Sequence, residues 1–86
     1  MKEERRTRAM KIHGRNTNLS LEPDFWQALG DIARDLGVSR VAIVAGIAER
    51  RSRPNLSSAV RVYVLEYYIA RFRDNANRGD TVRADE

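Results

Sequence analysis

The chain has 86 residues, no cysteine, and 16 Lys and Arg against 12 Asp and Glu, for a net charge of +4. This length predicts one small domain with a modest core, and the lack of cysteine excludes disulfides, thiolate nucleophiles and Cys-ligated metals, which suits a reducing cytoplasm. No run of about 18 apolar residues occurs, so we expect no membrane span, and the charged start lacks the apolar middle of a secretory signal.

The positive charge is concentrated at the start of the chain. Residues 1–16 hold six Lys and Arg against two Glu, which accounts for the whole net charge of +4. We expect residues 1–11 to form a flexible basic arm, although Arg8 to His13 could extend into a short strand with Gly14 as a bulge or turn behind it. Such an arm suits phosphate binding, and a solubilising tail is the equal alternative.

Residues 16–21, Asn-Thr-Asn-Leu-Ser-Leu, predict a strand over about 15–22. Successive side chains of a strand point to opposite sides, so one face is suited to burial: Thr17, Leu19 and Leu21. The other face carries only small polar groups: Asn16, Asn18 and Ser20. Because a lone strand cannot satisfy its backbone, we expect it to pair with the same strand of a second chain. A two-stranded ribbon fits the DNA major groove, where Asn can contact adenine.

Helical signals follow in order. Pro23 is favourable at a first helical position and Gly37 at a helix end, which predicts a helix over about 23–36. Ser39 is a good N-cap for a second helix over about 39–51, whose segment 41–48 is almost wholly apolar and therefore suited to a subunit interface. A third helix over about 56–73 follows, and residues 74–86 have little to bury and should fray.

The order of strand, helix, Gly-Val-Ser and helix resembles the ribbon-helix-helix family of DNA-binding proteins, the Arc/MetJ type. The resemblance is carried by the segments Thr17–Leu21, Pro23–Leu36 and Gly37–Arg40. A later block, Asn55-Leu56-Ser57-Ser58-Ala59-Val60-Arg61, is similar to a subgroup with an additional C-terminal helix, and with it the resemblance covers about residues 12–70.

The resemblance implies a mostly α fold with one short β-strand, built as an intertwined homodimer with an intermolecular antiparallel β-ribbon plus the third helix. It implies that the ribbon enters the major groove and that the residues reading bases are Asn16, Asn18 and Ser20. The residues expected at phosphates, from the basic arm, the start of the strand and the start of the second helix, are Arg5, Arg6, Arg8, Lys11, Arg15, Ser39 and Arg40. It implies no cofactor.

These expectations describe a cytoplasmic transcription regulator of the repressor type that binds double-stranded DNA as a homodimer, with pairing to a tetramer left open. One alternative is a protein-interaction or antitoxin-like module that grips a protein partner through the third helix, with DNA binding secondary. Another is a structural oligomer in which the ribbon only joins subunits. His13 is the only histidine, so we expect no metal site, and no group of side chains predicts an enzyme.

Overall fold

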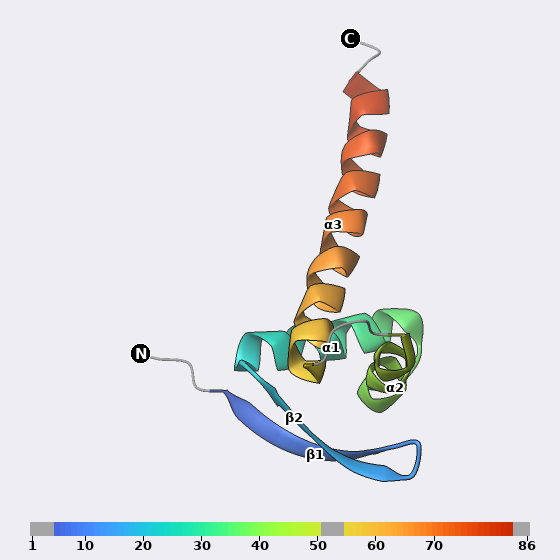
Figure 1. Cartoon of the computed structure of the whole chain (residues 1–86). Helices are drawn as coiled ribbons and strands as arrows, with labels where there is room; N and C mark the ends of the chain where they lie inside the picture. Colours follow the sequence, from blue (N-terminus) through green and yellow to red (C-terminus); the bar gives the residue numbers. More distant parts are fainter. Residues whose placement is uncertain (1–4, 51–54, 84–86) are drawn as a thin grey trace.

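A computed structural model describes residues 5–50 and 55–83, with side chains described as far as residue 76. Its elements are β1 (Arg6–Ile12), β2 (Arg15–Leu21), α1 (Pro23–Leu36), α2 (Arg40–Arg50) and α3 (Leu56–Arg83). Figure 1 shows the two strands as a hairpin beneath α1 and α2, while α3 rises on the other side and projects well beyond them. No described helix has the length and apolar character needed to cross a membrane.

The hairpin corrects two sequence expectations. β1 pairs with β2 in antiparallel register from Ile12↔Arg15 to Arg6↔Leu21, so the chain supplies both strands of a ribbon itself. We expected one strand, preceded by a flexible arm over residues 1–11, and residues 6–11 are instead a strand. The reason lies in the turn between them, where His13 (φ 52°) and Gly14 (φ 79°) both adopt positive φ. This conformation has the twist that folds two strands back on each other. Residues 1–4 lie outside the described residues.

The helix boundaries follow local signals. α1 has the expected bounds, with Pro23 in its first turn and Gly37 in the left-handed conformation (φ 73°) behind it. The Ser39 hydroxyl accepts a hydrogen bond from the Ala42 N–H (3.0 Å), and Asn55 Oδ1 caps α3 through the Ser58 N–H (3.1 Å). α3 continues to Arg83, which corrects the expected end near 73 and the fraying of residues 74–83. These residues contain no proline, so nothing in the backbone stops the helix.

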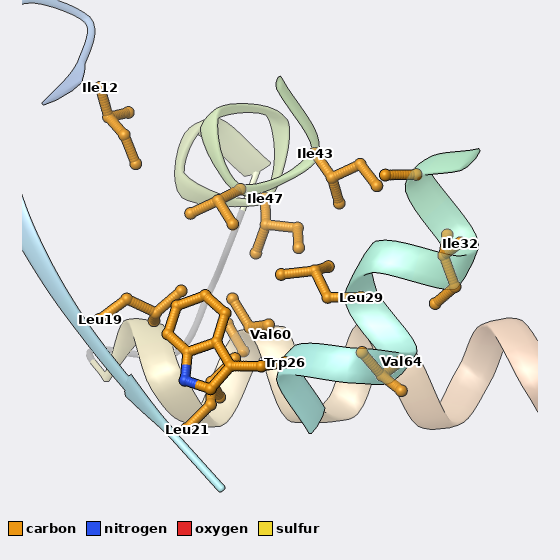
Figure 2. Packing of buried hydrophobic residues seen from close by; sticks show 13 residues of the cluster. Ile12, Leu19, Leu21, Trp26, Leu29, Ile32, Ile43, Ile47, Val60 and Val64 are labelled. Carbon is orange, nitrogen blue, oxygen red and sulfur yellow. The ribbon is translucent and has the colours of Figure 1, made fainter. Parts of the chain in front are cut away.

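All of the elements contribute to one apolar core, which Figure 2 shows from close by. The fully buried side chains come from β2 and the helices: Leu19, Leu21, Leu29, Ile32, Val44 and Val60. Each such side chain contributes about 1.5–3 kcal/mol relative to leaving it in water. The core therefore covers the inner face of the hairpin and leaves the opposite face to solvent.

Candidate nucleic-acid interface

The strand register sorts the hairpin residues into two faces, because directly opposed residues of an antiparallel pair point to the same side. On β2, Leu19 and Leu21 are fully buried, whereas Asn16 and Asn18 are exposed. Ser20 points the same way as the two asparagines but is partly buried. The alternation expected for β2 is therefore present in the folded chain.

β1 adds a second row to this exposed face. Lys11 is opposite Asn16, Ala9 is opposite Asn18, and Thr7 is opposite Ser20. We call these six residues the outward face: Thr7, Ala9, Lys11, Asn16, Asn18 and Ser20. All are short except Lys11, and the hydroxyls of Thr7 and Ser20 share a hydrogen bond of 2.5 Å. Sequence reasoning missed Thr7 and Ala9; the alternation within residues 6–12 carried the signal, but the density of charge there favoured an arm.

Three of the arginines expected at phosphates lie on the other face of the hairpin. Arg6, Arg8 and Arg15 are opposite Leu21, Leu19 and Ile12, on the core side. The Arg8 guanidinium carbon lies 4.9 Å from the ring centroid of Trp26, and the Arg6 carbonyl accepts a hydrogen bond from Trp26 Nε1 (3.0 Å). The side chains of all three remain exposed. Of the expected phosphate-binding residues in the hairpin, only Lys11 shares the outward face with the asparagines.

Arg5 is engaged at the open end of the hairpin. Its Nε lies 3.6 Å from one Glu22 carboxylate oxygen, and Arg61 of α3 donates to the other oxygen (3.1 Å). The pKa of the Glu22 carboxyl is lowered, first by a backbone hydrogen bond at Glu22 itself and then by the hydrogen bond from Arg61. The carboxylate therefore stays ionised, and it offsets part of the positive charge of Arg5.

The start of α2 was the other expected phosphate site. Ser39 is exposed, but its hydroxyl already caps the helix through the Ala42 N–H. The Arg40 side chain turns back over α1, where its Nε and Nη2 donate to the Trp26 carbonyl (3.2 and 3.1 Å). The N–H groups of Arg40 and Val41 have no backbone acceptor among the described residues. No acidic residue lies in this first turn, so its positive dipole end remains open to an anion.

An open cavity of about 540 Å³ separates β1 from the start of α2. Its lining includes Arg8, Ala9 and Met10 on one side and Ser39 to Val41 on the other, with α1 as its floor. Two of the lining side chains, Val38 and Val41, are apolar and exposed. Arg8, Arg34 and Arg40 also line the cavity, which is therefore a depression of mixed character flanked by a strand edge.

The whole hairpin is electropositive. Residues 5–21 contain five Lys and Arg and no Asp or Glu. His13 at the turn is paired with Glu49 of α2 (3.1 Å). Among the described residues, no three His, Asp or Glu side chains gather where they could hold a metal ion. The arrangement places hydrogen-bonding side chains on a positively charged ribbon.

A family model described as a ribbon-helix-helix domain matches residues 5–68, more than half of the chain. The matched segment begins with β1, so the first strand is part of the family pattern as well as the second. It extends through α2 into the first part of α3. Neither the curated proteins nor the solved structures gave a match.

Proposed function

Since this chain belongs to the ribbon-helix-helix family, we propose that it binds double-stranded DNA as a homodimer and regulates transcription. Domains of this family generally bind DNA and regulate transcription, and they are typically not enzymes. The observation that carries the proposal is the outward face, which is exposed apart from Ser20, has polar side chains at every position but Ala9, and lies opposite the face that covers the core. Polar side chains on such a face can contact base edges in the major groove.

Base reading is assigned to Lys11, Asn16 and Asn18. Their side chains are exposed and come from neighbouring positions on the two strands. Asn can make a bidentate contact to adenine, and Lys can donate to guanine O6 and N7. Ser20, the third residue expected to read bases, has a weaker claim because it is partly buried and its hydroxyl is shared with Thr7.

Phosphate binding is assigned mainly to the start of α2. The N–H groups of Arg40 and Val41 supply two free donors, and the helix dipole favours an anion there. Arg6, Arg8 and Arg15 add exposed positive charge on the core side of the ribbon, where they raise the general attraction to DNA. The Arg40 guanidinium has to leave the Trp26 carbonyl before it can reach a phosphate.

The homodimer is supported by one edge of the hairpin. Ile12 and Arg15 flank the two-residue turn, and the two residues that flank such a turn bond to each other through their backbones. Along each strand, every second residue from there bonds to the partner strand, and the residues between them point their backbone N–H and C=O groups away from it. On β2, Ser20 is one of the outward-pointing residues, and its N–H donates to the Ser57 hydroxyl of α3 (3.3 Å). On β1, Ala9 has the same orientation, faces the cavity, and has no hydrogen-bond partner among the described residues. We therefore assign the dimer contact to the β1 edge.

A salt series on duplex DNA tests this proposal. Affinity should fall linearly with the logarithm of salt concentration, because bound phosphates release counterions. Lys11→Ala should weaken binding, whereas Arg50→Ala, an exposed charge at the end of α2, should leave it nearly unchanged. Selection from a random duplex pool should then return one preferred sequence. Binding that is insensitive to salt, or equal loss in both variants, would contradict a hairpin interface.

The protein-interaction alternative has one observation in its favour, because α3 exposes apolar side chains that the domain does not cover. A variant that removes the exposed apolar side chains of α3 and keeps the hairpin intact separates DNA binding from protein interaction. If the protein is a DNA-binding regulator, that variant retains its affinity for duplex DNA. As a regulator of transcription it acts on DNA, so the cytoplasm remains our prediction for its location.

A further inference from the structure

α3 is apolar on two opposite sides. One side packs against the core through Val60, Val64 and their neighbours. The other side carries the α3 stripe, four large side chains with exposed fractions of 57%, 41%, 36% and 71%: Leu65, Tyr68, Ile69 and Phe72. At about 100° per residue, Leu65, Ile69 and Phe72 lie opposite Tyr63 and Tyr67, which pack on the core.

The α3 stripe lies on the turns of α3 from which Tyr67 and Arg71 contact Asp35 at the end of α1. From there α3 continues away from the hairpin (Figure 1). Its residues are spaced three, one and three apart, as in a helix–helix contact. Exposed apolar side chains gathered in one contiguous stripe mark an interaction site rather than ordinary surface.

We propose that the α3 stripe packs antiparallel against the α3 stripe of a second copy of this chain. The stripe is close to symmetric about Tyr68 and Ile69. In an antiparallel pair centred there, Leu65 lies against Phe72 of the second copy, and Phe72 against its Leu65. The two central positions, 68 and 69, meet at the two-fold axis. Every exposed apolar side chain of the stripe then has an apolar neighbour.

The charges beside the stripe select this direction. Glu66 and Arg73 lie on the same flank, two turns apart, and neither forms an ion pair with another described residue. In an antiparallel pair, the flank that carries Glu66 and Arg73 lies beside the same flank of the other copy, so each Glu66 faces the Arg73 of the other copy. In a parallel pair, it lies beside the opposite flank of the other copy. That opposite flank carries Arg71, which is already bound to Asp35 (2.7 Å). A parallel pair would thus place Arg73 against a flank without an acid.

A charge-reversal experiment on the full chain tests the proposal. Glu66→Arg and Arg73→Glu should each reduce association measured by sedimentation velocity, because like charges then face each other. An equimolar mixture of the two variants should recover it, since the mixed pair again places opposite charges together. Phe72→Glu should halve the mass of the largest species, and Ala70→Glu, an exposed position off the stripe, should not. Equal behaviour of the single variants and their mixture would overturn the antiparallel pairing.

Cysteine cross-linking gives an independent measurement, because the chain has no cysteine of its own. Ile69→Cys should form a disulfide with a second copy of itself under mild oxidation. Phe72→Cys should cross-link poorly with itself but efficiently with Leu65→Cys. Efficient self-linking of Phe72→Cys would indicate a parallel pair, and no linking at any position would show that something other than a second copy occupies the stripe. Both results overturn the proposal. Duplex DNA binding by Phe72→Glu should be retained, which separates this contact from the hairpin interface.

Discussion

Arg8 and Trp26 are in contact across the gap between the hairpin and α1, with the guanidinium carbon 4.9 Å from the ring centroid. The same indole donates its N–H to the Arg6 carbonyl (3.0 Å), so one side chain of α1 holds β1 at two neighbouring positions. An arginine in a basic segment is readily interpreted as a phosphate ligand. In this fold Arg8 helps to attach the strand on which the outward face is built.

Arg8 and Lys11 should therefore respond in opposite ways to loss of charge. Arg8→Gln should lower the free energy of unfolding by about 0.5–1 kcal/mol, because a cation–aromatic contact is lost, and should reduce DNA affinity only through the loss of general attraction, less than Lys11→Gln does. Lys11→Gln should leave the free energy of unfolding nearly unchanged and weaken DNA binding. Urea denaturation and a duplex-binding titration measure the two effects. A larger loss of DNA affinity in Arg8→Gln than in Lys11→Gln would contradict the assignment of the two faces.

Asn18 should affect base recognition without affecting the fold. Asn18→Ala removes an exposed side chain, so the protein should remain folded while losing about 1–3 kcal/mol on its preferred duplex and much less on random DNA. Leu19→Asn should instead impair folding, because it places an amide at a fully buried position. Circular dichroism and duplex titration distinguish these outcomes. Equal losses on preferred and random duplexes for folded Asn18→Ala would remove the base-reading role.

Proline substitutions should identify the edge used by the dimer. Ala9→Pro removes a backbone N–H that points away from β2, so the hairpin should survive while the dimer is lost. Asn18→Pro removes the equivalent donor from the β2 edge and should leave the dimer intact. Sedimentation of both variants in the Phe72→Glu background isolates this contact from pairing through α3. Loss of the dimer in Asn18→Pro alone would assign the contact to β2 instead.

Acid should weaken the attachment of α3 to α1. The Asp35 carboxylate accepts hydrogen bonds from the Tyr67 hydroxyl and from Arg71, and the Tyr67 bond is the larger cause of its lowered pKa. A lowered folded-state pKa contributes stability above the unfolded value of about 3.8, and this is lost as the pH falls through the folded value. Asp35→Asn and Tyr67→Phe should both flatten the decline in unfolding free energy as the pH falls below about 3.8. An unchanged pH profile in both variants would show that this contact does not contribute.

Much of the fold is determined by local sequence. Pro23 and Gly37 mark the two ends of α1, and the alternation in residues 16–21 determines which β2 side chains share a face. These features depend on φ preferences and on the period of side-chain direction, which act over a few residues. The asparagines of the outward face could be identified for the same reason.

Tertiary structure decided the rest of the interface. Residues 6–12 become a strand because the His13–Gly14 turn returns them to β2 and Trp26 holds them there. The register of that pairing sends Arg6 and Arg8 to the core side and Lys11 to the outward face, and a shift by one residue would exchange them. The charge of a residue does not encode its face. Only the pairing of two strands and their contact with α1 determines which basic side chains stand beside the asparagines.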